Sequence, residues 1–268
     1  MEIRGRRALV TGASKGIGAA IARELARAGA HVVLVARDAQ AIAMLADELG
    51  GSAYAADLAD LAQVSTLLSR VTAGGSPVDI LVNNAGIETA GHIVALIPDD
   101  IAAVFALNIV APAVLCGAFA KPMMERGEGH IVNISSLAGV AAFPGLAAYS
   151  ASKAALTHFT AGLRADFRGT AVGTTLVELG PVRTDMYSRA MSYGPTSQAF
   201  RRMLALGMIA EIGPELVARK VVEAVRLDRR HVRLPRRAGL SSVMQEMPRR
   251  LAEYMLAGVE AGPGSRVI

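Results

Sequence analysis

Short apolar runs alternate along the chain with longer segments that have a helical spacing of apolar residues. The runs lie at Arg7–Thr11, His31–Ala36, Ser52–Ala55, Asp79–Val82, His130–Ile134 and Ala171–Val177. The helical segments lie at Ile17–Ala28, Ala39–Leu49, Leu61–Val71, Asp99–Glu125 and Tyr149–Phe167. Runs that are apolar throughout are typical of parallel strands buried on both faces. The alternation predicts a single-domain, doubly wound α/β fold, with helices on both faces of a parallel sheet of about seven strands.

The regular alternation loosens after Gly180. Residues Asp185–Ile212, called the lid segment below, contain methionines and aromatic residues without strand periodicity. A connection of this length inside a compact domain is usually a functional lid or disordered. A helix at Pro214–Arg226 and a strand at His231–Leu234 are predicted next. We expect a main domain over residues 1–240, lid included, and a helical tail over residues 241–268.

Composition narrows the class of protein. The 268 residues are 52% hydrophobic and 19% charged, which is typical of soluble globular chains. The one cysteine, Cys116, excludes an internal disulfide framework and a multi-cysteine metal site, and fits a reducing cytoplasm. None of the five histidines has metal-ligand spacing to a carboxylate or to another histidine, so no metal site is expected.

Two uncharged runs, Ile101–Ala120 and Gly129–Ser152, have the length of a membrane span, for which ~20 residues suffice. Asn108 and Pro112 interrupt the first run, and further polar residues, glycines and Pro144 interrupt the second. These residues are costly in hydrocarbon. We interpret both runs as interior segments of a globular domain and expect a cytoplasmic protein.

A glycine-rich loop, Thr11-Gly12-Ala13-Ser14-Lys15-Gly16-Ile17-Gly18, joins the first predicted strand to the first predicted helix. Glycine permits unusual backbone angles at such a turn and lets a pyrophosphate approach the backbone. The helix N-terminus that follows offers free N–H groups to the phosphates. Glycines also simply form turns, but the place of this loop, with a second strand about twenty residues later, indicates a dinucleotide site.

The end of the second predicted strand bears on the choice of dinucleotide. A carboxylate at this strand end binds the ribose 2′-OH of NAD, whereas a nearby arginine accommodates the 2′-phosphate of NADP. Here Ala36 stands at the strand end, Arg37 follows it, and Lys15 of the glycine loop reaches the same region. These residues favour NADP(H). The alternative is a solvated Arg-Asp turn, and Asp38 keeps NAD(H) open as a cofactor.

The pattern Tyr149-x-x-x-Lys153 places a phenol and an ammonium group on one helix face, because residues four apart are neighbours. A free phenol titrates near pH ~10 and is a poor base at neutrality. A neighbouring cation favours the phenolate, and a positively charged nicotinamide ring adds to this effect. The pair alone is more typical of a packed tyrosine beside an exposed lysine.

Taken together, these motifs resemble the short-chain dehydrogenase/reductase family over Arg7 to about Leu234. In family order they are Thr11–Gly18, Asp57-Leu58, Asn83-Asn84-Ala85-Gly86, Asn108, Ile134-Ser135-Ser136, Tyr149-Ser150-Ala151-Ser152-Lys153 and Gly180-Pro181-Val182-Arg183-Thr184. The resemblance implies a Rossmann-fold catalytic domain over residues 1–240. It also implies an NADP(H)-dependent oxidoreductase that transfers a hydride between nicotinamide and a secondary alcohol or ketone.

The resemblance also implies catalytic roles. Tyr149 passes a proton to or from the substrate oxygen, and Lys153 lowers the Tyr149 pKa and holds the nicotinamide ribose. Ser136, thirteen residues before Tyr149, donates a hydrogen bond to the substrate oxygen, while its neighbour Ser135 is structural. Asn108 serves a proton-relay water chain, or else it is a satisfied amide in the core.

The cofactor contacts implied by the family cover most of the motifs. They are Gly12, Ser14, Lys15, Gly16, Ile17, Gly18, Arg37, Asp38, Asp57, Leu58, Asn84, Ala85, Gly86, Tyr149, Lys153, Pro181, Val182 and Thr184. Asp57 is placed at the adenine, although an acidic residue there is also typical of a helix N-cap. Asn84 to Gly86 line the adenosine ribose, and Thr184 meets the carboxamide.

The sequence departs from the family pattern at two places, of which the second bears on the substrate. Leu179 stands where the family usually has proline before the glycine. The last predicted strand runs into Leu234-Pro235-Arg236-Arg237 in place of the Asp-Gly-Gly ending of acyl-carrier-protein ketoreductases. This speaks against a 3-oxoacyl thioester reductase, which stays the alternative substrate class. The methionines and aromatics of the lid segment instead favour an apolar small-molecule substrate.

Other partners follow from helix faces and charge. The family forms dimers or tetramers through the helices that contain Asn108 and Tyr149. The net charge of +5 concentrates in Arg219–Arg250, where ten basic residues meet three acidic ones. This basic segment, with the apolar stripe after Ser241, is a candidate for peripheral membrane contact or for docking within an oligomer. No nucleic-acid motif is present, and a non-catalytic cofactor sensor of the same fold is the alternative function.

Overall fold

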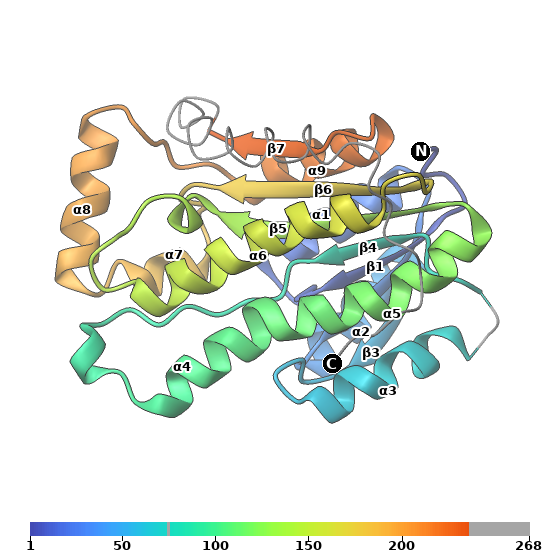
Figure 1. Cartoon of the computed structure of the whole chain (residues 1–268), viewed down its shortest axis with the longest axis horizontal. Helices are drawn as coiled ribbons and strands as arrows, with labels where there is room; N and C mark the ends of the chain where they lie inside the picture. Colours follow the sequence, from blue (N-terminus) through green and yellow to red (C-terminus); the bar gives the residue numbers. More distant parts are fainter. Residues whose placement is uncertain (74–75, 236–268) are drawn as a thin grey trace.

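Seven parallel strands form one sheet in the residues that the structure, a computed structural model, describes: 1–73 and 76–235. Their order is β3-β2-β1-β4-β5-β6-β7 (Figure 1). The strands are β1 Arg7–Thr11, β2 His31–Ala36, β3 Ser52–Ala55, β4 Ile80–Asn83, β5 Gly129–Ser136, β6 Val172–Leu179 and β7 His231–Leu234. The winding direction reverses between β1 and β4. A doubly wound sheet binds ligands at this point, outside the carboxyl ends of its strands.

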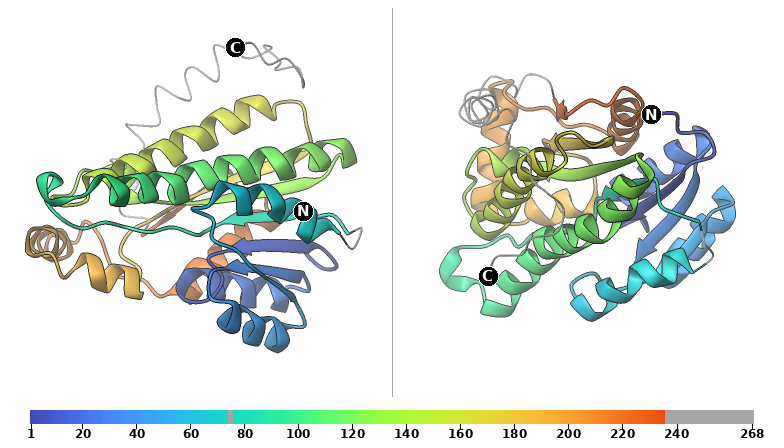
Figure 2. Two further views of the ribbon diagram at one scale, coloured as in Figure 1. Left: turned by 90° about the horizontal axis from the view of Figure 1, so that it is seen from below. Right: turned by 45° about the vertical axis from the view of Figure 1, so that its right-hand side comes forward.

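Helices cover both faces of the sheet (Figure 2). The main ones are α1 Gly16–Arg27, α2 Ala39–Leu49, α3 Leu61–Thr72, α4 Pro98–Phe105, α5 Ala111–Arg126, α6 Ala147–Asp166 and α9 Pro214–Arg226. Successive strand side chains point to opposite faces, so Val10 of β1 packs with α1, α2 and α9, and Leu9 with α3, α5 and α6. The doubly wound fold predicted from the sequence is confirmed.

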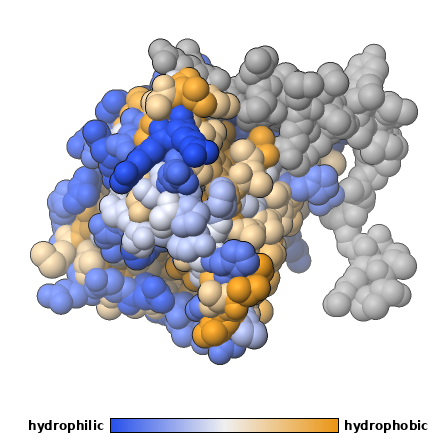
Figure 3. Space-filling view, turned by 90° about the vertical axis from the view of Figure 1, so that its left-hand side faces the viewer, coloured by the Kyte–Doolittle hydropathy of each residue, from blue (hydrophilic) through white to orange (hydrophobic). Residues whose placement is uncertain are grey.

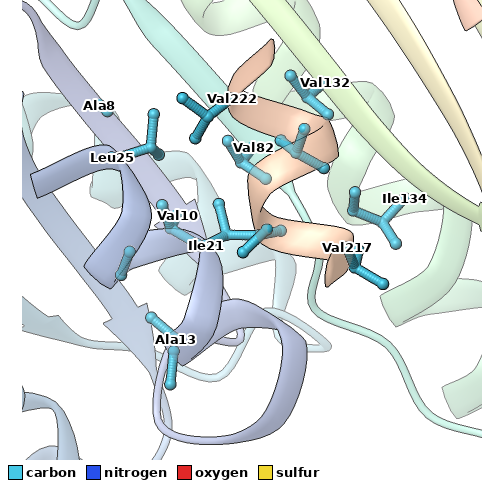
Figure 4. Close-up of a cluster of buried hydrophobic side chains, with 14 of the residues drawn as sticks. Ala8, Val10, Ala13, Ile21, Leu25, Val82, Val132, Ile134, Val217 and Val222 are labelled. Atoms are coloured by element: carbon cyan, nitrogen blue, oxygen red, sulfur yellow. The ribbon is translucent and has the colours of Figure 1, made fainter. Parts of the chain in front are cut away.

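The core between α1 and α9 holds the centre of the sheet in place. Ile21 and Leu25 of α1 face Val217 and Val222 of α9 across the ends of the strand side chains (Figure 4). Ile21, Leu25 and Val217 have no exposed surface. This contact fixes α1, and with it the glycine-rich loop at the start of that helix.

One helical stretch, Pro98–Arg126, is long and apolar enough to cross a membrane by length and composition. It consists of α4, a π-helical turn (η2, Ala106–Val110) and α5, where the sequence predicted one helix at Asp99–Glu125. Leu115, Phe119 and Met123 of α5 pack against the sheet together with α3 and α6. The stretch therefore contributes a buried face to the core.

The lid segment contains two helices, α7 Asp185–Ala190 and α8 Gly194–Ala205. Its apolar residues show no simple period because some of them serve packing against the loop after β5, including the stacked rings of Phe143 and Phe200. The predicted tail 241–268, the domain boundary at 240 and the part of the basic segment beyond residue 235 lie outside the described residues.

Truncation of one buried side chain tests the importance of the α1–α9 core. Ile21→Ala removes methyl groups from a fully buried position and leaves a cavity, which costs about 2–5 kcal/mol. We expect this loss in the free energy of unfolding measured in urea. Met44→Ala on α2 is the matched control, because Met44 is 66% exposed. This variant changes the free energy of unfolding by less than about 0.5 kcal/mol. Equal losses in the two variants would contradict the assignment.

Candidate active site

A cleft of about 820 Å³ opens at the carboxyl edge of the sheet. The predicted site residues that line it are Gly12, Ser14, Lys15, Gly16, Ile17, Arg37, Asp38, Asp57, Leu58, Asn84, Ala85, Gly86, Ser136, Tyr149, Lys153, Pro181, Val182 and Thr184. Gly18 and Asn108 are not among the lining residues. The strands β6 and β7 point toward this edge, where α7 and α8 lie (Figure 1). Figure 3 looks onto the same end, which carries hydrophobic and hydrophilic surface side by side.

Close backbone packing explains two glycines of the loop after β1. A Cβ at Gly18 would lie 2.2 Å from the Gly12 carbonyl oxygen, and one at Gly12 would lie 2.9 Å from Cα of Ala85. Gly12 also has a φ of 64°, a backbone angle that residues with a side chain rarely adopt. The glycine loop therefore packs directly against the loop after β4.

Side-chain hydrogen bonds join the same two loops. The Thr11 Oγ1 accepts hydrogen bonds from the backbone N–H groups of Asn84 (2.9 Å) and Ala85 (3.0 Å). The Asn84 Nδ2 donates to the carbonyl oxygens of Thr11 (2.9 Å) and Gly12 (3.3 Å). Asn84 thus positions the glycine loop with its side chain, a role that the motif alone did not indicate.

The N-terminus of α1 suits the phosphates of a dinucleotide. Its N-cap residue, Lys15, makes no side-chain capping hydrogen bond, and the first turn contains no acidic residue. Free N–H groups at a helix N-terminus bind anions, helped by the helix dipole. Together with the crowded glycines, this end of the cleft fits a pyrophosphate.

The residues at the end of β2 separate into structural and free side chains. Asp38 is the N-cap of α2, since its Oδ1 accepts a hydrogen bond from the Ala41 N–H at 3.0 Å. Arg37 is exposed at the cleft and has no hydrogen bond or ion pair with another described residue. Lys15 pairs with Asp185 at the start of α7, at 2.6 Å and largely in solvent. Both cations are therefore on the cleft, while the nearby carboxylate caps a helix.

Asp57 and Leu58 follow β3, the strand next to β2, and both line the cleft. The Asp57 Oδ1 accepts a hydrogen bond from the Ala59 N–H at 3.0 Å, while the Asp57 N–H donates to Gln63 Oε1 at 2.9 Å. The N-cap of α3 is Asp60, so the alternative reading of Asp57 as a helix cap does not apply. Leu58 is buried behind it.

Tyr149, Lys153 and Ser136 meet at the inner end of the cleft. The Lys153 Nζ lies 5.9 Å from the centre of the Tyr149 ring and donates a hydrogen bond to the Ile134 carbonyl oxygen at 3.0 Å. The Ser136 Oγ accepts from the Ala138 N–H at 3.1 Å and donates to the Leu179 carbonyl oxygen at 3.3 Å. Helix α6 and the end of β5 together hold the three side chains.

Burial controls the protonation of this group. Burial raises the pKa of Tyr149 to about 12, against the opposite effect of its hydrogen bond with Ser136; the Glu88 carboxylate raises this pKa further. Burial lowers the pKa of Lys153 to about 8, so the ammonium form prevails at pH 7. Burial of the phenol thus outweighs its hydrogen bond with Ser136, and Tyr149 is a neutral proton donor at neutrality.

Ser135 and Asn108 make hydrogen bonds that fix segments around Tyr149. The Ser135 Oγ donates to the Lys153 carbonyl oxygen at 3.0 Å. The Asn108 Nδ2 donates to the Ile87 carbonyl oxygen and to Ser152 Oγ, both at 2.9 Å, and its Oδ1 accepts from the Ile87 N–H at 2.9 Å. Asn108, in the π-helical turn, is thus a satisfied amide that joins two segments of the site.

The lid segment supplies an apolar wall. The cleft residues on this side are Phe143, Leu146, Met186, Tyr187, Ala190, Phe200 and Ile209. Phe143 stacks on Phe200 with ring centres 4.7 Å apart, and Tyr187 meets Phe200 edge-on at 5.8 Å. The ring stack fixes α8 against the loop after β5. Rigid aromatic walls of this kind are typical of small-molecule pockets.

Glu88 and Arg189 were not predicted from the sequence. Both line the cleft, and Arg189 Nε lies 3.2 Å from Glu88 Oε1. Glu88 directly follows the Asn83–Ile87 segment, but nothing in the sequence pairs it with a residue 101 positions later. Among the described residues no group of three or more His, Cys, Asp or Glu could hold a metal ion.

Comparison with known proteins gives the family. The short chain dehydrogenase family model matches residues 6–192. An uncharacterized short-chain type dehydrogenase/reductase of Sinorhizobium fredii is 41% identical over 186 residues, which cover 69% of this chain and 73% of the relative. The ketoacyl reductase HetN of Nostoc sp. is 39% identical over 178 residues, covering 65% and 62%.

Solved structures agree on fold and cofactor class. A metagenomic short-chain oxidoreductase in complex with NADP has a TM-score of 0.70 and 34% identity, covering 87% of this chain and 97% of that one. A short chain dehydrogenase/reductase from Burkholderia phymatum in complex with NAD has a TM-score of 0.78 and 27% identity, covering 99% and 100%. The chain belongs to the short-chain dehydrogenase/reductase family and is an oxidoreductase that uses a nicotinamide cofactor.

Proposed function

We propose that the protein is an NADP(H)-dependent oxidoreductase that interconverts a secondary alcohol and a ketone, with Ser136, Tyr149 and Lys153 as its catalytic residues. One observation carries the proposal. The three side chains meet at one end of a continuous cleft whose other end is the glycine loop and the open N-terminus of α1. The glycine loop and the N-terminus of α1 would hold the phosphates of a nicotinamide dinucleotide, and Tyr149 and Lys153 would lie beside its ring.

The three residues divide the proton chemistry. The nicotinamide supplies or accepts the hydride. In the direction of reduction, the neutral Tyr149 phenol protonates the carbonyl oxygen, and the Ser136 hydroxyl donates a hydrogen bond to the same oxygen. The Lys153 ammonium stabilises the phenolate that results. In the direction of oxidation Tyr149 first loses its proton to solvent, and the phenolate, stabilised by the Lys153 ammonium, then takes the proton of the substrate hydroxyl.

The positioning residues support this arrangement. Ser135 binds the backbone of Lys153, and Asn108 binds Ile87 and Ser152, so the rigid frame around Tyr149 does not depend on the substrate. We propose that Asn108 also lies on the route by which protons reach Lys153. Its Oδ1 is close to Gly86, where a Cβ would lie 3.0 Å from Asn108 Oδ1 and 3.4 Å from Lys153 Nζ.

NADP(H) is the proposed cofactor in preference to NAD(H). Arg37 stands at the cleft with no protein partner in the described residues, and Asp38 is engaged as a helix cap. A free guanidinium binds a phosphate well through charge-assisted hydrogen bonds. Lys15 adds a second cation on the same wall.

The proposed substrate has an apolar body. The aromatic and aliphatic wall formed by Phe143, Phe200 and their neighbours matches apolar carbonyl compounds. A 3-oxoacyl thioester is the alternative, and one relative carries the name ketoacyl reductase. The ending Leu234-Pro235-Arg236-Arg237 differs from that of acyl-carrier-protein ketoreductases and disfavours this alternative.

We also propose a homo-oligomer formed through α5 and α6. Val110 and Val114 are each 38% exposed on the outer side of the long helix. A Cβ added to Gly117 of α5 or Gly162 of α6 would meet nothing within 4 Å, so both backbones lie open. Apolar, open helix faces of this kind pack closely against a second copy.

Removing one hydroxyl group tests the catalytic proposal. We expect Tyr149→Phe to lower kcat for ketone reduction by about a hundredfold or more, the size of a general-acid contribution, because no other group replaces the phenol. NADPH affinity, measured by fluorescence, stays unchanged. Tyr54→Phe removes a phenol hydroxyl outside the cleft and is the matched control, which retains activity. Turnover of carbonyl substrates by Tyr149→Phe at the wild-type rate would refute the role of Tyr149.

Cofactor preference is tested at Arg37. Hydrogen bonds to charged groups contribute about 1.5–3 kcal/mol, so Arg37→Ala weakens NADPH binding by roughly ten- to a hundredfold. NADH affinity changes little, because NADH lacks the 2′-phosphate. Arg201→Ala, an exposed arginine on α8, controls for the loss of surface charge. An equal effect of Arg37→Ala on the two cofactors would overturn the preference.

The oligomer proposal is tested by charge. Val114→Glu places a carboxylate at the centre of the proposed interface, where a desolvated charge is costly. We expect sedimentation velocity to show a dimer or tetramer for the wild type and a smaller species for the variant. Met44→Glu, at an exposed position of α2, leaves the oligomer intact. A monomeric wild type would end this proposal.

A further inference from the structure

The buried carboxylate of Glu88 and its pairing with Arg189 find no use in the reaction described above. Arg189 Nε lies 3.2 Å from Glu88 Oε1, and Arg189 Nη2 lies 3.4 Å from Glu88 Oε2. The two ends of the pair differ in environment: the Glu88 side chain is 4% exposed and the Arg189 side chain 59%. The Glu88 carboxylate is therefore enclosed by protein, and the more exposed Arg189 guanidinium, from α7, lies on its solvent side.

Glu88 lies near the reacting groups. It lines the same cleft as Ser136 and Tyr149, and its charge is close enough to raise the pKa of the Tyr149 phenol. A substrate that binds in this cleft with its carbonyl oxygen at Tyr149 therefore shares the cleft with the Glu88 carboxylate. The cleft that this carboxylate shares with Phe143, Leu146 and Phe200 has both polar and apolar lining residues.

The chemistry of a buried carboxylate defines what it binds. An ionised carboxylate only accepts hydrogen bonds and has about four acceptor positions, of which Arg189 occupies one on each oxygen. An apolar substrate that displaces water from the remaining positions leaves them unsatisfied, which costs free energy. A substrate with a hydroxyl group at this place satisfies them.

We propose that Glu88 determines substrate specificity: held by Arg189, it accepts a hydrogen bond from a hydroxyl group one or two carbons from the reacting carbonyl. This inference rests on the proposed function. It refines the substrate from an apolar ketone to a hydroxyketone with an apolar body, and in the reverse direction to the corresponding diol. Arg189 is a positioning residue that keeps the carboxylate ionised and oriented.

Charge disfavours the other ligand that the pair suggests. A substrate carboxylate bound by Arg189 would approach Glu88, and two carboxylates at one guanidinium repel each other. Burial already raises the pKa of Glu88, against the effect of Arg189, so sharing the Arg189 guanidinium with a second carboxylate makes the Glu88 carboxylate less stable still. A neutral hydroxyl donor avoids both costs.

Matched pairs of ketones provide the test. Each pair contains a hydroxyketone and a ketone of the same size with methyl in place of hydroxyl: 2-hydroxyacetophenone with propiophenone, and 3-hydroxypropiophenone with butyrophenone. The kcat/KM of NADPH-dependent reduction is measured for all four. Sites built to bind a substrate hydroxyl discriminate strongly against analogues that lack it, so the wild type prefers at least one hydroxyketone by about tenfold or more.

Variants then assign the preference to Glu88. Glu88→Leu removes the preference for the hydroxyketone and makes the methyl ketone the better substrate. Glu88→Gln, which keeps one acceptor oxygen, lowers the preference partly. Glu211→Gln is the matched control: Glu211 accepts a hydrogen bond from the Tyr187 hydroxyl at 2.8 Å but does not line the cleft, and the preference stays as in the wild type. NADPH affinity reports that each variant is folded.

The outcomes separate this inference from the proposed function. The wild type and Glu88→Leu are compared by the ratio of kcat/KM for the hydroxyketone to kcat/KM for the methyl ketone. An equal ratio in the two proteins overturns the role of Glu88 and leaves the proposed function standing. A wild type that binds NADPH but reduces none of the four ketones overturns the proposed function, and this inference with it. A ratio that falls equally in Glu88→Leu and Glu211→Gln also refutes the specific role.

Discussion

The contact between the loop after β1 and the loop after β4 is the constraint on which the site depends. Gly18 packs so closely on the Gly12 carbonyl that no side chain fits between them, and Asn84 and Thr11 tie the two loops with four hydrogen bonds. The contact lies where the winding of the sheet reverses. It therefore sets the distance between the glycine loop and the segment Gly86–Glu88, which borders the proposed catalytic residues.

A buried polar network fixes the other wall of the cleft. The Asn133 side chain of β5 accepts a hydrogen bond from Asn83 Nδ2 of β4 and donates one to Thr160 of α6, both at 2.9 Å. Ser135, two residues on, bonds to Thr157 and to the Lys153 backbone of the same helix. Buried polar groups need partners, so these bonds set the position of α6 along β5. Tyr149 and Lys153 take their places from that register.

The regular elements of this chain could be predicted from local pattern, and the contacts across the lid could not. Strands β1, β2, β3 and β7 and helices α2 and α9 have the predicted bounds, because apolar runs there end at caps or turns such as Asp38 and Gly50. The glycine loop and the Tyr149–Lys153 pair are also local patterns, and their residues line one cleft. Glu88 and Arg189 meet only because the topology brings β4 and α7 together. The high pKa of Tyr149 likewise reflects burial that no local pattern shows.

Two ion pairs attach the short helix α7 to the rest of the protein, and their surroundings differ. Lys15–Asp185 stands in solvent with both side chains about two-thirds exposed, whereas Glu88 of the other pair is almost fully enclosed. Dissolved salt screens charges in water and reaches buried ones much less. Rising ionic strength therefore weakens Lys15–Asp185, at the start of α7, more than Glu88–Arg189, near the end of that helix. At high salt the start of α7 is therefore held to the glycine loop less firmly than its end is held to the segment after β4.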